Sequence, residues 1–176
     1  MAGSRPLGTK DISVHLLDTD VIWALRGHDP ARVDDPLFEW AASQIPNTLF
    51  VSAISLMEFE NGTRSLERTD KATAAAIRKW LETRLRPAFE GRIVAIDDAV
   101  IRSWSHLGYA DFRDGMLAAT ALNHGLIIAT RAPQNFRAGK VKTINPWKYI
   151  TDADNLDWRR SSRSAPIWLK SLFVRA

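Results

Sequence analysis

Short apolar runs alternate with longer stretches of helical spacing along most of the chain. Apolar runs bounded by turn residues are typical of buried strands, and they predict strands at 14–17, 49–52, 92–96, 126–129 and 141–144. Apolar residues spaced three and four apart predict helices at 21–26, 36–44, from 55 onward, 69–85, 99–107 and 111–124. This alternation predicts an α/β fold with a mostly parallel sheet of about five strands that helices cover on both faces.

The chain divides into three predicted segments. Residues 1–12 are expected to form a flexible leader, and residues 13–150 carry the alternation of strands and helices. Residues 151–176 differ, because an acidic stretch, three arginines and an apolar patch at 167–174 follow one another without further alternation. We expect the apolar patch of this C-terminal extension to pack either on the domain or on a partner.

The composition excludes some kinds of site. Of the 176 residues, 45% are apolar and 25% are charged, which is ordinary for a globular protein. No apolar run approaches the roughly 20 residues of a membrane helix, and the first residues lack the apolar stretch of a secretory signal. We therefore expect a cytoplasmic protein without membrane contact. Cysteine is absent, so disulfides and thiolate metal sites are excluded, and a metal would need oxygen or imidazole ligands.

The charge balance favours polyanionic partners. The net charge is +4 and the pI is about 9.7. A basic surface attracts nucleic acid through long-range electrostatics and the release of counterions. Many basic proteins bind no nucleic acid, so this observation needs support from the motifs.

Three acidic residues lie near the starts of predicted helices. Asp18 follows the first predicted strand, and Asp114 stands in the first turn of a helix that Asp111 would cap. Glu58 completes the pattern Ser55-x-x-Glu58, which fits a capping box. Each acid has a purely structural explanation, because helix starts favour capping side chains and negative charge.

The α/β topology predicts that these acids converge. Ligands of open α/β sheets bind beyond the carboxyl ends of the strands, and the three helices are expected to begin at that edge. Clustered carboxylates repel unless a cation neutralises them, and Mg²⁺ prefers oxygen ligands. Such a metal lowers the pKa of bound water and orients an in-line attack on phosphorus. Arg131, after the fourth strand, is a candidate for a phosphate contact.

Six short motifs follow one another between about residues 14 and 148. They read LDTDVI at 17–22, SAISLMEF at 52–59, DGMLAATA at 114–121, HGL at 124–126, TR at 130–131 and NPW at 145–147. In content and order they resemble the motifs of the PIN-domain family, in particular the VapC/FitB-type toxins of bacterial toxin–antitoxin pairs. The resemblance implies a PIN-like three-layer α/β/α domain.

The resemblance also implies a function and a site. It implies endoribonuclease activity that depends on Mg²⁺ or Mn²⁺, with RNA as the substrate, inhibition by a small cognate antitoxin, and a homodimer. It assigns the metal-ligand roles to Asp18, Glu58 and Asp114, and it suggests Thr19 as a neighbour of the site that contributes to substrate binding.

The chain departs from the family pattern in three places. The family usually has a fourth acid where this chain has Asn135, whose amide oxygen can still bind a metal or orient water but carries no charge. The stretch between Leu107 and Asp114 is shorter than expected, which could shift the helix that carries Asp114. The segment after Trp147 is longer than usual. These departures bear on whether the protein is fully active, and they leave the predicted fold unchanged.

Two other interpretations stay open at the level of sequence. Loss of the fourth acid could leave a degenerate PIN domain that binds antitoxin or RNA without cleaving. A HAD-type phosphatase, with Asp18 as nucleophile, would suit the pattern Asp18-x-Asp20 after a strand. The phosphatase hypothesis explains neither Glu58 nor the DGMLAATA motif.

Overall fold

A five-stranded, all-parallel sheet forms the centre of the molecule. The computed structural model describes residues 13–28, 35–150 and 166–173, so the expected leader lies outside the described residues. The strands are β1 (His15–Leu17), β2 (Leu49–Ser52), β3 (Ile93–Val94), β4 (Ile127–Ala129) and β5 (Thr143–Ile144). Their order is β3-β2-β1-β4-β5. The predicted α/β class and the parallel sheet are confirmed.

The central position of β1 follows from its pairing. Leu16 of β1 is in register with Phe50 of β2 on one side and with Ile128 of β4 on the other. All of these pairs are parallel, so the carboxyl ends of β1, β2 and β4 lie side by side at one edge of the sheet. Residues that follow these three strands are therefore brought together.

Successive side chains of each strand enter different hydrophobic clusters. Leu16 and Ile128 belong to one buried cluster, whereas Leu17 and Ala129 belong to the other. This division follows from the two-residue period of a strand, in which neighbouring side chains point to opposite faces. Both faces of the sheet are thus covered, as expected for a parallel sheet.

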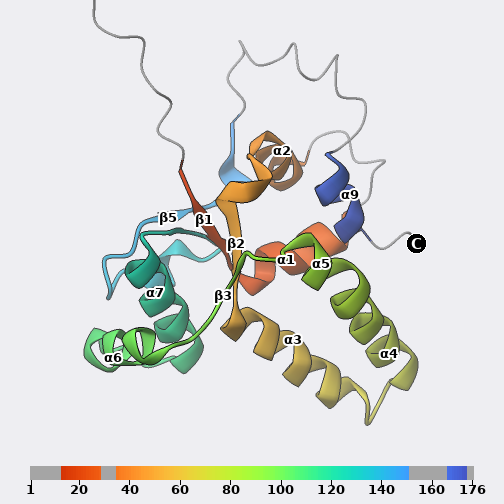
Figure 1. Ribbon diagram of the computed structural model, residues 1–176, viewed down its shortest axis with the longest axis horizontal. Helices are drawn as coiled ribbons and strands as arrows, with labels where there is room; N and C mark the ends of the chain where they lie inside the picture. The colour runs from red at the N-terminus through yellow and green to blue at the C-terminus, as the bar shows by residue number, and fades with distance from the viewer. Residues whose placement is uncertain (1–12, 29–34, 151–165, 174–176) are drawn as a thin grey trace, which may run out of the picture.

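Helices cover the two faces as separate layers (Figure 1). On one side lie α6 (Asp98–Leu107) and α7 (Phe112–His124), and on the other lie α1 (Thr19–Arg26), α4 (Lys71–Trp80) and α5 (Arg86–Ala88). The remaining long helices are α2 (Pro36–Ser43) and α3 (Ala53–Leu66). Short turns of 3₁₀ helix occur at Pro46–Thr48, Pro133–Phe136 and Pro146–Lys148.

Two helix starts differ from the sequence prediction. The capping box at Ser55 is wrong: the cap of α3 is Ser52, whose hydroxyl accepts the Ile54 N–H at 3.2 Å. The chain passes from β2 straight into α3, so Ser55 lies inside the helix and Glu58 is in the second turn. The predicted helix 69–85 begins later, because the Asp70 side chain accepts the Thr73 N–H, and the regular α-helix ends at Trp80.

After Trp80 the helix changes its hydrogen-bonding pattern. A π-helical segment spans Leu81–Leu85 and leads into α5. Leu81 and Leu85 are both buried in the core, so the wider turn keeps these two side chains on the inner face of the helix.

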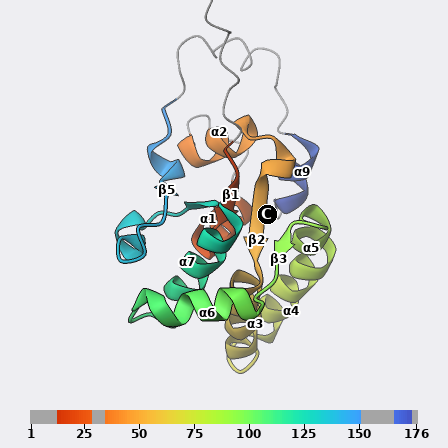
Figure 2. The ribbon, with the colours of Figure 1, turned by 60° about the vertical axis from the view of Figure 1, so that its left-hand side comes forward.

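The C-terminal helix α9 (Ile167–Leu172) packs on the domain next to α1 and α5 (Figure 1 and Figure 2). Leu169 and Leu172 are fully buried there, and the Trp80 indole N–H donates to the Leu172 carbonyl at 2.8 Å. Of the two expected partners for the late apolar patch, the domain itself is the one observed. No helix in the described ranges is long and apolar enough to cross a membrane.

Candidate active site

Asp18 is the first residue beyond the carboxyl end of β1 and the N-cap of α1. Its carboxylate accepts the Thr19 N–H at 2.7 Å and the Thr130 hydroxyl at 2.7 Å. Thr130 directly follows β4, the neighbouring strand. The side chain is only 8% exposed, so its orientation is fixed from both sides. The capping role expected for an aspartate here coexists with a place in the cluster of acids.

Burial makes Asp18 reluctant to ionise. It raises the pKa of Asp18 to about 6, and the nearby Asp20 carboxylate contributes to this rise. Hydrogen bonds from Thr130 and Thr19, and the positive charge of Arg113, act in the opposite direction. Loss of solvent favours the neutral carboxyl, whereas donors and cations favour the charged form. A divalent cation beside Asp18 would therefore stabilise the ionised carboxylate.

Asp114 reaches the same edge from the first turn of α7. Asp111 caps this helix, because its carboxylate accepts the Asp114 N–H at 2.9 Å. Asp114 itself is not needed as a cap, as the sequence predicted, and it is 7% exposed. The Asn135 amide donates to Asp114 Oδ2 at 3.0 Å. The short connection before α7 thus still leaves Asp114 facing the predicted site residue Asn135.

Glu58 approaches from α3. One of its carboxylate oxygens accepts a hydrogen bond from the Thr19 hydroxyl, and the other accepts one from Arg113 at 2.9 Å. Thr19, which the resemblance placed next to the site, thus orients Glu58 with its side chain and Asp18 with its backbone N–H.

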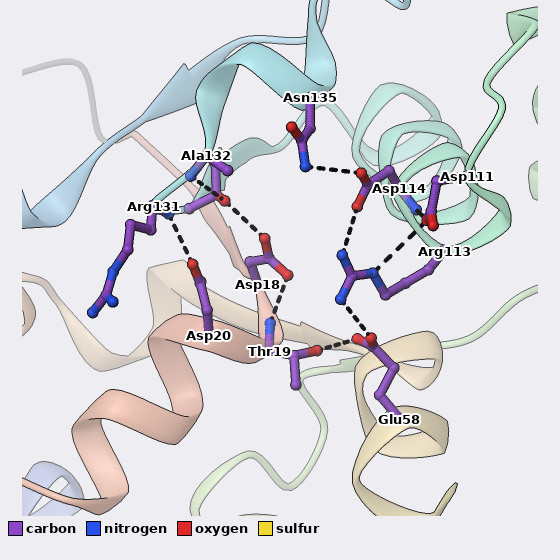
Figure 3. A network of polar contacts seen from close by, with 11 residues as sticks. Asp18, Thr19, Asp20, Glu58, Asp111, Arg113, Asp114, Arg131, Ala132 and Asn135 are labelled. Atoms are coloured by element: carbon purple, nitrogen blue, oxygen red, sulfur yellow. Dashed lines mark hydrogen bonds and ion pairs between the residues drawn. The ribbon is translucent and has the colours of Figure 1, made fainter. Parts of the chain in front are cut away.

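Arg113 lies between the acids (Figure 3). Its Nη1 contacts Glu58 Oε1 at 2.9 Å, its Nη2 contacts Asp114 Oδ1 at 3.2 Å, and its Nε is 3.9 Å from Asp111 Oδ1. The hydrogen bond to Glu58, together with the surrounding negative charge, raises the pKa of Arg113 above its ordinary value. Arg113 is therefore the cation that joins α3 to α7 in this structure.

Asp20 and Arg131 meet at the other end of the cluster (Figure 3). The Arg131 N–H donates to Asp20 Oδ2 at 3.1 Å, which fixes the turn after β4. The Arg131 guanidinium lies 4.1 Å from the centre of the Trp147 ring, a cation–π geometry. Asp20 Oδ1 is buried without a hydrogen-bond partner in the described part of the chain.

The donor set suits a hard divalent cation, but Arg113 fills part of the space. The available oxygens are carboxylates and one amide, the ligands that Mg²⁺ and Mn²⁺ accept. Burial, with a smaller contribution from Asp20, raises the pKa of Asp18, and the buried Asp20 Oδ1 has no hydrogen-bond partner among the described residues, so a cation would stabilise both carboxylates here. As placed here, no group of three acids or histidines in the described ranges is close enough to hold an ion.

The structure brings the predicted site residues to one edge of the sheet. They are Asp18, Thr19, Glu58, Asp114, Arg131 and Asn135. Three further residues of this cluster were not predicted from the sequence: Asp20, Arg113 and Thr130. Thr130 could have been found, because it directly follows a predicted strand next to β1, and Asp20 lies two residues from Asp18. For Arg113 the sequence offers no such signal.

The match to a known family decides the identity of this domain. Residues 16–138 match the PIN domain family. The chain belongs to the PIN-domain family. Relatives of this PIN domain include VapC ribonuclease Y4jK of Sinorhizobium fredii, 33% identical over 76% of this chain and 97% of that protein. Toxin FitB of Neisseria gonorrhoeae is 34% identical over 75% of this chain and 97% of its own length. The family assignment does not favour the phosphatase hypothesis.

Solved structures agree with the assignment of this PIN domain. The crystal structure of FitAcB from Neisseria gonorrhoeae contains a chain with a TM-score of 0.65 and 31% identity, over 77% of this chain and 99% of that one. The structure of VapBC2 from Rickettsia felis, bound to a promoter DNA fragment, has a TM-score of 0.51 at 14% identity and shows the fold alone. The predicted PIN-like α/β/α architecture is confirmed.

Proposed function

We propose that this PIN-domain protein is a metal-dependent endoribonuclease and the toxin of a toxin–antitoxin pair. The observation that supports the proposal is that Asp18, Glu58 and Asp114, from three separate elements, lie at one carboxyl edge of the sheet, where Arg113 bridges Glu58 and Asp114. The names of the VapC and FitB relatives support the activity. Asp18, Glu58 and Asp114 would hold the Mg²⁺ or Mn²⁺, which supplies a Lewis acid and a water of lowered pKa.

The other residues of the site position the acids and the RNA. The Thr19 and Thr130 hydroxyls hold the carboxylates of Glu58 and Asp18. The Asn135 amide holds Asp114, in the position where the family usually has an acid. Arg131 is the candidate contact to an RNA phosphate, since its guanidinium lies against Trp147 and forms no ion pair with a described carboxylate.

The proposed partners are RNA, a small cognate antitoxin and a second copy of the chain, in the cytoplasm. Similar chains come from structures described as FitAcB and as FitAB bound to a DNA fragment, which are complexes of more than one component. Co-purification with the product of a neighbouring small gene, followed by size measurement, tests both protein partners.

RNA cleavage tests the proposed activity and the metal ligands together. We expect the purified protein to cleave RNA with Mg²⁺ or Mn²⁺ and to stop when EDTA is added. Asp18→Ala or Asp114→Ala should lower the rate by roughly a hundredfold or more, because the metal and its activated water are no longer held. The matched control is Asp98→Ala, an exposed acid of α6 paired with Arg102. Equal rates in all four proteins would count decisively against this site.

A degenerate PIN domain that binds without cleaving is the second candidate. The observation that favours it is the neutral Asn135 amide beside Asp114. Asn135→Asp restores the fourth acid and should increase cleavage if the missing charge limits activity. A wild-type protein that already cleaves at a rate this substitution does not improve would eliminate the degenerate alternative.

A further inference from the structure

The guanidinium of Arg113 lies between Glu58 and Asp114. It comes from the first turn of α7, next to Asp114, and it reaches across to Glu58 on α3 (Figure 3). The residue is thus a bridge between two elements that each supply a proposed metal ligand.

Arg113 binds one oxygen of each of two proposed metal ligands. Glu58 directs one oxygen to Arg113 and the other to the Thr19 hydroxyl. Asp114 likewise directs one oxygen to Arg113 and the other to the Asn135 amide. Each carboxylate therefore has a neutral donor on one oxygen and the same positive group on the other. A metal ion bound between Glu58 and Asp114 would repel the guanidinium, so the two cations compete for this place.

The contacts of Arg113 are strong enough to form and weak enough to exchange. An arginine stays charged at every physiological pH, so it neutralises the acids whenever the metal is absent. Its side chain is 45% exposed, so water competes for its contact to Glu58, whereas the contact to Asp114, whose side chain is 10% exposed, is better shielded. A divalent cation carries twice the charge and can displace it, while the freed side chain moves into solvent.

We propose that Arg113 is a built-in competitor for the metal ion: its guanidinium holds Glu58 and Asp114 in the metal-free protein and leaves them when a divalent cation binds. This inference rests on the proposed metal-dependent function. It makes metal affinity, and with it activity, subject to a threshold of free metal that is set by a residue of the chain itself.

Metal binding without RNA tests the competition. Mn²⁺ is titrated into the wild-type protein, Arg113→Gln and the control Arg102→Gln, and free Mn²⁺ is followed by electron paramagnetic resonance. Arg102 is an exposed arginine of α6 paired with Asp98, so its variant loses the same charge away from the site. We expect Arg113→Gln to bind Mn²⁺ roughly tenfold more tightly than the control, because no charge-assisted hydrogen bonds have to be displaced there.

Thermal melting provides the second readout. In EDTA, Arg113→Gln should melt below the wild type, because Glu58 and Asp114 then repel each other without a cation, and Mn²⁺ should raise its melting temperature more than that of the wild type. Arg113→Lys keeps the charge but lacks the fork that spans two carboxylates, so its Mn²⁺ affinity should lie between those of the wild type and Arg113→Gln. This variant replaces Arg113→Gln in the test if the glutamine variant folds poorly.

The outcomes separate this inference from the nuclease proposal. If the wild type binds Mn²⁺ and Arg113→Gln binds it no more tightly than Arg102→Gln, the competition is overturned and the nuclease site stands. Weaker binding by Arg113→Gln overturns it as well, since Arg113 would then organise the ligands. If none of the three proteins binds Mn²⁺, both the competition and the proposed metal site fail.

Discussion

Asp18 carries an electrostatic cost in the folded protein that its proposed role as a metal ligand would explain. It is buried beside the ends of β1 and β4, and its carboxylate accepts two hydrogen bonds, which favour the charged form. Burial and Asp20 nevertheless raise its pKa to about 6 from an ordinary value of 3.8. At neutral pH the metal-free protein therefore keeps a charge in a place that disfavours it, a cost that binding of a cation would relieve.

Asp18→Asn should stabilise the metal-free protein at pH 8, and the gain should disappear at low pH. Between about pH 4 and 6 the folded protein holds the Asp18 proton more tightly than the unfolded chain, so the free energy of unfolding falls as the pH rises through this window. Above pH 6 the full cost is present, and the neutral amide removes on the order of 2 kcal/mol of it. Urea unfolding in EDTA at pH 8 and at pH 4 measures both values.

The control for this prediction is Asp98→Asn, which changes an exposed carboxylate. Surface substitutions of this kind usually stay within about 0.5 kcal/mol. A gain at pH 8 that matches the control, or one that persists unchanged at pH 4, would contradict the explanation by burial.

Gly115 shows what holds the acid-bearing helix in place at the scale of elements. The glycine lies in α7, directly after Asp114, where α7 packs against α6 and the turn that follows it. A Cβ at this position would lie 2.8 Å from the Trp104 ring and 2.9 Å from the Tyr109 Cβ. The glycine is therefore required by the close approach of α7 to α6 and to the turn after it, and any larger residue forces α7, the Trp104 side chain or the turn to shift.

Gly115→Ala and Gly62→Ala form a matched pair of substitutions. In Gly115→Ala the overpacking against Trp104 should outweigh the gain in helix propensity and destabilise the protein by about 2 kcal/mol. Gly62 lies on the exposed face of α3, where an added Cβ would meet no atom within 4 Å, so Gly62→Ala should stabilise by roughly 0.5–1 kcal/mol. Thermal unfolding measures the change in melting temperature of each variant. Changes in the same direction for both variants would contradict the packing argument.

At the scale of the whole molecule, the sequence predicted what depends on local pattern and topology. All five strands were located, and the parallel order explains why Asp18, Glu58 and Asp114 meet. The start of α3 was wrong because two serines three residues apart, Ser52 and Ser55, can each act as a cap, and only the end of β2 decides between them. The bridge by Arg113 could not be predicted, because a long flexible side chain takes its place only from the charges around it.

The C-terminal extension was the least predictable part of the molecule. Its composition indicated an apolar patch without saying what covers it, since long-range docking leaves no periodic signal. In the structure, Trp168 and Phe173 join the hydrophobic cluster that already contains Leu17 and Trp80. The helix α9 thus extends the core on the face opposite α6 and α7, beyond the part of the chain that matches the PIN family.

Docking of α9 predicts a sharp contrast between two neighbouring side chains. Leu169 is fully buried where α9 packs on the domain, whereas Ile167 is 87% exposed. Leu169→Ala should lower the free energy of unfolding by about 3 kcal/mol, because it removes buried methyl groups and leaves a cavity. Ile167→Ala should change it by no more than about 0.5 kcal/mol. Urea unfolding compares the two variants, and similar small effects in both would mean that α9 does not stay docked in solution.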